Sequence, residues 1–326
     1  MKPPAALVRT ARDLWRFQWW ILMNGLGPAD QQGRYRRPPG AFTALPPVPE
    51  PDDLAAGHVL IVGRSCPWAH RAWLTWTLRR LQPSIALLVV DPDPAAGRWR
   101  FREPFEGCHT LMELYRRSGA DPSARATVPA LWSRGKGRIL INESARLIEL
   151  LNRWPAAAEA PDLAPSGRQE AIDHWRERLQ GDVNDGVYRC GFARTQAAYD
   201  EAVEALFRTL EAVDRELSDQ RRQGRHWLCG DSPTLADVVL FPTMIRFEAV
   251  YAPLFGCSQR PLWQFPALWQ WRSRFHRLEG VAATCNSGAW RSDYFGALFP
   301  LHPSGIVPAG PDLATLVGED HSPTLL

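Results

Sequence analysis

The sequence has no closely spaced pair of cysteines, although six cysteines occur among its 326 residues. The six are scattered, and no two form a CxxC pair: Cys66, Cys108, Cys190, Cys229, Cys257 and Cys285. This spacing argues against a zinc ribbon, a dithiol redox motif and a dense disulfide framework. We therefore expect a cytoplasmic protein in a reducing compartment, with no bound metal.

A strong excess of one charge is also missing. Lys and Arg number 38, and Asp and Glu number 35, which gives a formal net charge of only +3. No dense block of Lys and Arg with interleaved aromatic residues stands out, so nucleic acid is not an expected partner. Hydrophobic residues make up 45% of the chain, which is enough to build the core of an ordinary globular protein.

The apolar run near the N-terminus, WWILMNGLG, is too short to span a bilayer, and no cleavage site of the signal-peptide type follows it. Read together with the preceding ARDLWRFQ, it predicts an amphipathic helix. We expect this helix to pack on the protein itself or on a partner subunit. Attachment to a membrane surface is the alternative.

The pattern along the chain predicts an N-terminal segment, two domains and a tail. Residues 1–54 combine the predicted helix with a Pro-rich stretch that is either a linker or an arm over a site. Residues 55–155 have the order strand, helix, strand, hairpin and helix, which is typical of a thioredoxin-like domain. Residues 165–285 carry long helical patterns with almost no strand signal, and residues 286–326 show no clear periodicity. The predicted fold class is α/β plus all-α.

Within the first domain, apolar runs at 58–64 and 85–91 predict two strands joined by a helix that begins at Pro67. Residues 92–124 look polar and irregular apart from a helical patch at LMELYRR. A hairpin of two short strands is predicted at 127–141.

Cys66 lies between the first strand and the helix that Pro67 opens, so we expect it at the helix N-terminus. There the free N–H groups and the helix dipole favour an anion, so a thiolate has a lowered pKa and is the nucleophilic form. His70 and Arg71 add positive charge, and His70 is either a proton carrier or a structural histidine. Because Ala69 stands where a dithiol protein has its second cysteine, an external thiol must complete the cycle. The alternative is that Cys66 is only a small buried residue.

Two further motifs suit a thiol-containing ligand. Val128–Pro129 enters a strand opposite the thiol, where this fold holds a cis-proline and a backbone that can pair with an extended ligand. Glu143–Ser144 at a helix start can take the amine and carboxylate of an amino-acid headgroup, or can simply cap the helix. Thr234 and Asp237 predict a capping box with a folding role.

Segments spread over residues 58–311 together resemble one known family. They are SCPWAHR (65–71), TVPALW (127–132), INES (141–144), DVNDGVYRCGFARTQAAYDEAV (182–203), LADVVLFPTMIRFEAVY (235–251) and SGIVPAGP (304–311). The sequence is similar to the glutathione transferases of the glutathionyl-hydroquinone reductase type, also called the Xi class. The resemblance implies a thioredoxin-like domain, a helical glutathione-transferase C-terminal domain, glutathione as co-substrate and a homodimer.

The resemblance also assigns roles to individual residues. Cys66 matches the catalytic cysteine, and Tyr188 in DGVYRCGF matches a tyrosine that faces the aromatic substrate and can supply a proton. Tyr251 and Tyr294 are expected in the substrate pocket. The residues expected to contact glutathione are Trp99, Arg125, Val128, Glu143 and Ser144.

The tail departs from the family pattern. Where the family commonly has His-Tyr-Tyr followed by Ser-His, this chain has Asp293, Tyr294 and Phe295, followed by Ala297 and Leu298. A phenol and two histidines are therefore lost, which concerns the substrate half of the site more than the glutathione half.

The activity that the resemblance implies is reduction of glutathionyl-hydroquinones to hydroquinones through a mixed disulfide between Cys66 and glutathione. The expected ligand is a small aromatic glutathione conjugate, and no membrane span is expected. Two alternatives stay open. An omega-like thiol transferase, acting on protein–glutathione disulfides or dehydroascorbate, would use Cys66 without the tyrosines, and a non-catalytic relative would only bind ligands.

Overall fold

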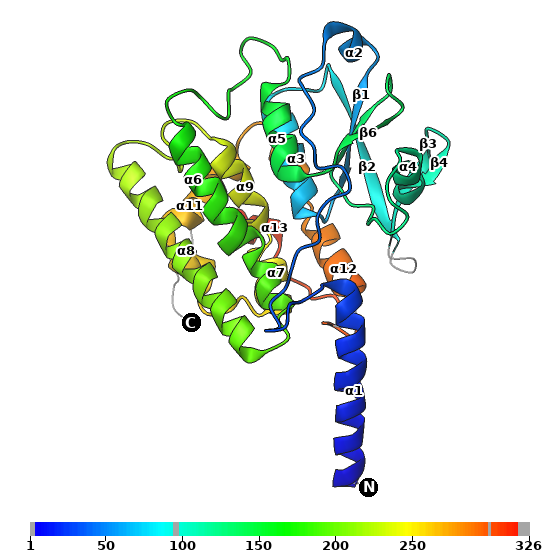
Figure 1. Ribbon diagram of the computed structural model, residues 1–326. Coiled ribbons are helices and arrows are strands. Elements are labelled where there is room, and N and C mark those ends of the chain that lie inside the picture. Colours follow the sequence, from blue (N-terminus) through cyan, green and yellow to red (C-terminus); the bar gives the residue numbers. More distant parts are fainter. Residues whose placement is uncertain (1–3, 94–97, 299–300, 319–326) are drawn as a thin grey trace.

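A six-stranded mixed sheet forms the first domain, with its strands in the order β4-β3-β2-β1-β5-β6 (Figure 1). The structure is a computed structural model that describes residues 4–93, 98–298 and 301–318. The strands are β1 (His58–Gly63), β2 (Ile85–Asp93), β3 (Arg98–Phe105), β4 (Cys108–Thr110), β5 (Ala130–Ser133) and β6 (Arg138–Ile141). β1 and β2 are parallel, and the remaining pairings within the sheet are antiparallel.

Three helices complete this domain: α3 (Pro67–Leu78), α4 (Leu111–Arg117) and α5 (Ser144–Arg153). α3 connects the parallel strands β1 and β2 and contacts both β1 and α5. All six residues of β1 are buried, as an uninterrupted apolar strand in the middle of a covered sheet should be. The predicted thioredoxin-like order of strand, helix, strand, hairpin and helix is confirmed.

The prediction of an irregular stretch at 92–124 is wrong. β2 continues to Asp93, and β3 and β4 extend the sheet before α4 begins. In β3 the exposed Arg100 and Arg102 alternate with the buried Phe101, which is the period of a strand. The density of charged and turn-forming residues on either side conceals this short alternation.

The second domain is helical, as predicted. Its elements are α6 (Gln169–Leu179), η1 (Gln180–Asn184), α7 (Gly186–Gly191), α8 (Gln196–Arg222), α9 (Leu235–Met244), η2 (Phe247–Tyr251), α10 (Ala252–Phe255), η3 (Leu262–Gln264), α11 (Pro266–His276) and η4 (Ala282–Thr284). The predicted capping box is present at the start of α9, where Thr234 N donates to Asp237 Oδ2 at 2.9 Å.

One described segment, Leu235–Phe255, has the length and hydropathy of a membrane span. Its most apolar window is 78% buried inside the protein, which is the environment of a core helix. α9 also packs against α3 and α6, so this segment joins the two domains.

The tail is more regular than its sequence suggests. It contains α12 (Ser287–Ala297) and α13 (Leu313–Val317), two helices that the sequence, with no clear periodicity in residues 286–326, did not predict. Asn286 caps α12 by accepting from Ala289 N at 2.8 Å. α12 returns to the first domain, where the buried Trp290 donates from Nε1 to Arg64 O at 3.1 Å.

The N-terminal helix α1 (Ala5–Leu26) extends away from the body of the protein (Figure 1). Met23 is its one buried residue, so α1 does not pack on the protein for most of its length, and the expected packing on a partner subunit stays a prediction. The residues that follow, not the helix, run between the two domains (Figure 1).

Residues 27–50 form an arm that runs between the two domains to the short helix α2 (Pro51–Ala55) (Figure 1). Arg194 N in the helical domain donates to Gly33 O at 2.9 Å. Phe42 N donates to Asn142 Oδ1 at 2.7 Å, and Asn142 N donates back to Phe42 O at 2.9 Å. The Pro-rich stretch is therefore an arm attached to both domains rather than a plain linker.

Candidate active site

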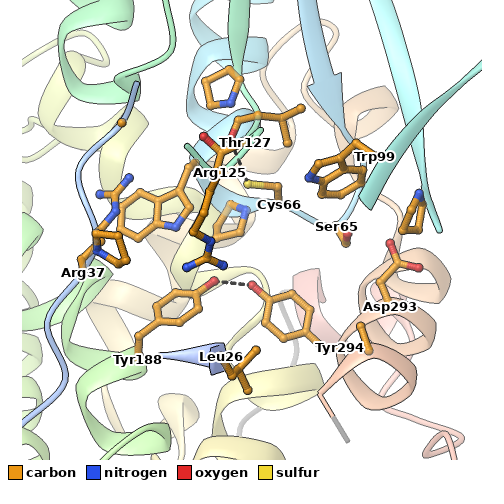
Figure 2. A pocket seen from close by; sticks show the side chains of 18 of the residues that line it. Leu26, Arg37, Ser65, Cys66, Trp99, Arg125, Thr127, Tyr188, Asp293 and Tyr294 are labelled. Carbon is orange, nitrogen blue, oxygen red and sulfur yellow. Dashed lines mark hydrogen bonds between the residues drawn. The ribbon is translucent and has the colours of Figure 1, made fainter. Parts of the chain in front are cut away.

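A cavity of about 340 Å³ lies where the arm, both domains and α12 meet (Figure 2). Every one of these parts contributes to its wall. The lining residues used below are Leu26, Arg37, Ser65, Cys66, Trp68, Trp99, Arg125, Val128, Glu143, Tyr188, Asp293, Tyr294, Ala297 and Leu298.

Cys66 occupies the N-cap position of α3, as predicted, and its thiol faces this cavity. Its Sγ donates to Val128 O at 3.4 Å, and the Val128–Pro129 bond is cis, as the sequence predicts. The thiol therefore lies beside a backbone edge that can pair with an extended peptide.

The pKa of Cys66 does not follow the prediction. Burial raises the pKa of the Cys66 thiol, while the N–H groups of Ala69 and Trp68 and the charges of Arg246 and Arg37 act in the opposite direction. The expected lowering is wrong because desolvation by burial outweighs the helix N-terminus. The thiolate is stabilised by these four groups but is not the resting form at neutral pH.

His70 is a structural residue, and the positive charge expected of it is absent. Its Nδ1 accepts from Arg246 Nη1 at 2.8 Å, which leaves Nε2 to donate to Thr284 Oγ1 at 2.7 Å. Burial and the charge of Arg246 hold the pKa of His70 well below its usual range. The structure therefore favours a structural role for His70 over the role of a proton carrier.

Arg246 is a fully buried guanidinium that sequence reasoning missed. It donates from Nε to Ser65 O at 3.2 Å and from Nη2 to Arg64 O at 3.3 Å, the two carbonyls that precede Cys66. Its guanidinium also lies 4.3 Å from the centre of the Trp290 ring on α12. Arg246 thereby fixes the loop that carries the thiol from the opposite domain.

Replacing Arg246 with Gln is expected to raise the pKa of Cys66 further, because a positive charge that favours the thiolate is removed. The rate at which iodoacetamide alkylates Cys66 is measured at a series of pH values by mass spectrometry of the Cys66 peptide. The midpoint of the curve of rate against pH should shift to higher pH. Below the midpoint, the rate should fall roughly three- to tenfold, which corresponds to about 1 kcal/mol.

Arg272→Gln is the matched control. Arg272 is also fully buried, pairs with Glu248 at 2.7 Å and lies over Trp269 at 3.9 Å, but it has no contact with the Cys66 loop. Both variants should lose thermal stability. If the midpoint of Cys66 alkylation shifted equally in both variants, loss of packing and not the charge of Arg246 would determine the pKa of Cys66.

The residues predicted to contact glutathione gather around the thiol. Trp99, Arg125, Val128 and Glu143 line the cavity, whereas Ser144 lies just behind it, with 1% of its surface exposed. No hydrogen-bond partner of Ser144 Oγ is found among the described residues, although this oxygen is buried. An unpaired buried hydroxyl at a helix start is suited to a polar ligand atom.

Gly63 makes room for Trp99. A Cβ at this position would lie 2.6 Å from Trp99 Cη2, so a larger residue would overlap the six-membered ring of the indole. Figure 2 shows Trp99 on one side of Cys66 and Arg125 reaching into the cavity.

Arg37 on the arm is a second functional candidate that the sequence did not reveal. Its guanidinium lies 3.8 Å from the centre of the Trp68 ring, and its Nη atoms lie 4.0 Å from Glu143 Oε1 and 3.8 Å from Asp185 Oδ1. Glu143 also caps α5 by accepting from Ala145 N at 3.3 Å, so it has both of the roles considered for it. Opposite charges from three parts of the chain therefore meet at this end of the cavity.

Three tyrosines form a chain of phenols on the other side of the thiol. Tyr188 and Tyr294 are joined by a hydrogen bond of 2.5 Å between their hydroxyl oxygens (Figure 2). The hydroxyl of Tyr251 lies 3.4 Å from that of Tyr294. Tyr251 does not line the cavity, contrary to the prediction, because Tyr188 and Tyr294 cover it. Burial raises the pKa of Tyr188 and of Tyr294 well above the usual range, so both phenols stay protonated.

The altered tail residues divide into two groups. Asp293, Ala297 and Leu298 line the cavity with Tyr294, whereas Phe295 is buried against His302, with ring centroids 5.0 Å apart. Burial raises the pKa of Asp293. The departures from the family pattern thus change the wall of the cavity on the aromatic side.

No group of three or more His, Cys, Asp and Glu side chains arranged to hold a metal ion occurs in the part of the chain that the structure describes. All six cysteines are free thiols. The cavity itself offers a thiol, phenols and charged side chains.

Comparison with known families and proteins identifies two matching domains and several relatives. The glutathione S-transferase N-terminal domain matches residues 65–154, and the glutathione S-transferase C-terminal domain matches residues 196–274. Glutathionyl-hydroquinone reductase PcpF of Sphingobium chlorophenolicum is 36% identical over 263 residues, which cover 77% of this chain and 82% of that protein. Glutathionyl-hydroquinone reductase YqjG of Escherichia coli is 34% identical, with coverages of 77% and 78%.

Solved structures give the same result. The glutathione S-transferase Xi from Phanerochaete chrysosporium has a TM-score of 0.79 at 30% identity, covering 87% of this chain and 94% of that one. The glutathione-bound structure of Escherichia coli YqjG has a TM-score of 0.72 at 33% identity, with coverages of 81% and 88%.

Proposed function

This chain belongs to the glutathione transferase family, among its Xi-class glutathionyl-hydroquinone reductases, and we propose that it reduces glutathionyl-hydroquinones to hydroquinones. The observation that carries the proposal is one cavity that holds both a thiol at a helix N-terminus and a hydrogen-bonded pair of phenols. A thiol alone would suit many disulfide exchanges. The phenols add a proton source for breaking a carbon–sulfur bond.

Glutathione binds, in this proposal, along the backbone edge next to Cys66. Val128 offers its backbone to the cysteinyl part of glutathione, and Trp99 covers the opposite side. Glu143 takes the amine of the γ-glutamyl group, while Ser144 and the N–H groups at the start of α5 take its carboxylate. Arg125 reaches into the cavity and supplies positive charge beside the ligand.

The first chemical step is attack of the Cys66 thiolate on the sulfur of the glutathionyl-hydroquinone. A bond forms between Cys66 Sγ and the glutathione sulfur, the sulfur–aryl bond breaks, and the aryl carbon keeps the electron pair. That carbon takes a proton from Tyr188, directly or through water, and leaves as the hydroquinone. Tyr294, hydrogen-bonded to Tyr188, can return a proton to it.

The second step restores the thiol. A second glutathione, as thiolate, attacks the glutathione sulfur of the mixed disulfide, which releases glutathione disulfide and the Cys66 thiolate. The sum is one conjugate and one glutathione converted to one hydroquinone and one glutathione disulfide. Ala69 stands where a second cysteine would otherwise do this work, so the external thiol is required.

Product analysis tests the proposal directly. The protein is mixed with a glutathionyl-hydroquinone and excess glutathione, beside a Cys66→Ala control. Free hydroquinone and glutathione disulfide in equal amounts, absent from the control, are expected. If glutathione becomes bonded to Cys66 from glutathione disulfide while no hydroquinone is released, the omega-like thiol transferase is the correct function. Cytoplasmic location and a homodimer remain predictions.

Arg37 is predicted to contribute to glutathione binding. Replacing Arg37 with Met keeps the contact with the Trp68 ring but removes the charge beside Glu143 and Asp185. KM for glutathione is expected to rise roughly 5- to 50-fold, since a charge-assisted hydrogen bond contributes about 1.5–3 kcal/mol and part of it is screened by water. Steady-state kinetics with varied glutathione measure this.

Arg36→Met is the matched control. Arg36 is the neighbouring residue on the same arm and pairs with Asp30 at 2.9 Å, away from the cavity wall. Its KM should stay within about twofold of the native value. Equal increases in KM for both variants would mean that the arm, not the Arg37 charge, had been disturbed.

A further inference from the structure

Helix α1 concentrates exposed apolar side chains. Of the eleven large hydrophobic residues that are exposed in the described part of the chain, eight are on this helix: Leu7, Val8, Leu14, Trp15, Phe17, Trp20, Ile21 and Leu22. Phe17 is 61% exposed and Leu14 is 58% exposed, although both would be core residues in most helices. Such a patch marks a surface that binds a partner.

Most of the apolar side chains of α1 share one side of the helix. Leu7, Leu14 and Ile21 repeat every seven residues and form a ridge, and Phe17 and Leu22 flank it. At 3.6 residues per turn, this apolar face covers about half of the circumference. The opposite side carries three basic residues: Arg9, Arg12 and Arg16.

The charge of the helix has one predominant sign. Asp13 is the single acidic residue between Ala5 and Leu26, against three arginines. It lies 3.6 Å from Arg12, with both side chains more than half exposed, so this pair neutralises little. Trp15 and Trp20 stand on the two borders of the basic stripe.

We propose that α1 attaches the protein to a membrane surface that contains anionic phospholipids. The helix lies in the plane of the headgroups, with its apolar face toward the acyl chains. Arginines beside a Trp-, Phe- and Leu-rich face are the composition of helices that bind in this way. The three arginines complement the negative headgroups, each contributing to the attraction near the surface.

Pairing with a second copy of α1 explains the surface less well. A two-helix seam buries a narrow stripe, two residues in seven, such as the ridge through Leu7, Leu14 and Ile21. It leaves Val8 and Leu22 at the sides of the seam still exposed. A lipid interface covers the whole apolar half of the helix and also uses the basic stripe.

The position of α1 relative to the cavity gives the attachment a consequence. The last turn of α1 is held by the body, since Met23 is fully buried and Arg194 Nη2 donates to Gly27 O at 2.7 Å. Leu26 in this turn lines the cavity beside Tyr188 and Tyr294 (Figure 2). Attachment therefore brings the aromatic side of the cavity close to the lipid surface, where apolar aromatic compounds partition.

Co-sedimentation of the full chain with lipid vesicles tests the proposal. Binding is expected to vesicles of phosphatidylcholine mixed with phosphatidylglycerol, and at least about tenfold weaker binding to phosphatidylcholine alone. The double variant Leu14→Glu, Phe17→Glu should lose binding to both. A variant with Arg9, Arg12 and Arg16 all changed to Gln should bind the anionic vesicles as weakly as the neutral ones. Added salt should weaken the binding of the native protein to anionic vesicles but not the binding of this variant.

The control variant is Trp263→Ser, which removes an exposed hydrophobic residue outside α1 and should bind like the native protein. Vesicle-free turnover of each variant shows that its fold is intact. No sedimentation with either kind of vesicle overturns the proposal. A second result would also overturn the proposal: the native protein is a dimer in light scattering and binds no vesicles, and the Leu14→Glu, Phe17→Glu variant is a monomer. In that case α1 would join two copies of the chain.

Discussion

Cys66→Ser is expected to reduce the turnover of a glutathionyl-hydroquinone by roughly 10³-fold or more, the order of loss that follows removal of a catalytic nucleophile. A serine hydroxyl at this N-cap is not ionised at neutral pH, and it cannot form a disulfide with glutathione. Intact mass spectrometry after incubation with glutathione disulfide should show one added glutathionyl group on the native protein and none on the variant. Glutathione should still bind, because Val128, Trp99 and Glu143 are unchanged.

Cys285→Ser is the control for this experiment. Cys285 is also a half-buried free thiol, but it lies outside the cavity wall, and its Sγ donates to Val281 O at 3.6 Å. Burial raises the pKa of Cys285 to about 11, so it is a poor nucleophile. Turnover that survives in Cys66→Ser and disappears in Cys285→Ser would move the catalytic role to the second thiol.

Tyr188→Phe is expected to slow hydroquinone release by about 10²–10⁴-fold, the usual contribution of a general acid. The variant keeps the aromatic ring, which stacks on Trp68 at a centroid distance of 5.9 Å, and loses only the proton donor. KM for glutathione should therefore change little. Single-turnover measurement of hydroquinone release isolates this step from regeneration of the thiol.

Tyr251→Phe provides the matched comparison. Tyr251 is in the same chain of phenols but lies behind Tyr294, outside the cavity wall, so the loss of its hydroxyl should cost less than about tenfold. Formation of the mixed disulfide from glutathione disulfide should be normal in both variants, because it needs no proton on carbon. A fully active Tyr188→Phe enzyme would remove Tyr188 from the mechanism and favour Tyr294 as the donor.

The parts of the site that could be predicted from sequence are those set by local chain geometry. A buried strand followed by Cys66 and Pro67 places a thiol at a helix N-terminus, whatever the rest of the fold does. The Glu143 cap follows in the same way from neighbouring residues. The cis bond at Val128–Pro129 instead followed from the place of this proline in the predicted fold.

The parts that could not be predicted depend on contacts between distant segments. Arg246 is 180 positions from Cys66, and its role depends on how the helical domain sits against the β1–α3 loop. Arg37 belongs to a stretch without regular structure, where no periodicity shows which side chain turns inward. The pKa of Cys66 depends on desolvation by the cavity wall, which no motif describes.

The family resemblance supplied the phenols but not their geometry. It placed Tyr188, Tyr251 and Tyr294 in one pocket, whereas the structure puts Tyr251 behind the other two. Relatives share the residue types at these positions. Which hydroxyl reaches the cavity is decided by the packing of α7, η2 and α12 in this chain.

The N-terminal arm and α12 both hold the two domains together. The arm connects Gly33 to the helical domain and Phe42 to Asn142 in the sheet domain, and α12 returns Trp290 to the carbonyl of Arg64. Both terminal segments thus tie together two lobes that the polypeptide itself joins only once, through residues 154–168. Cleavage of that connection would leave a nicked molecule whose lobes stay associated. Loss of structure in the helical lobe would remove Arg246 from the carbonyls that precede Cys66 and so expose the thiol loop of the sheet lobe.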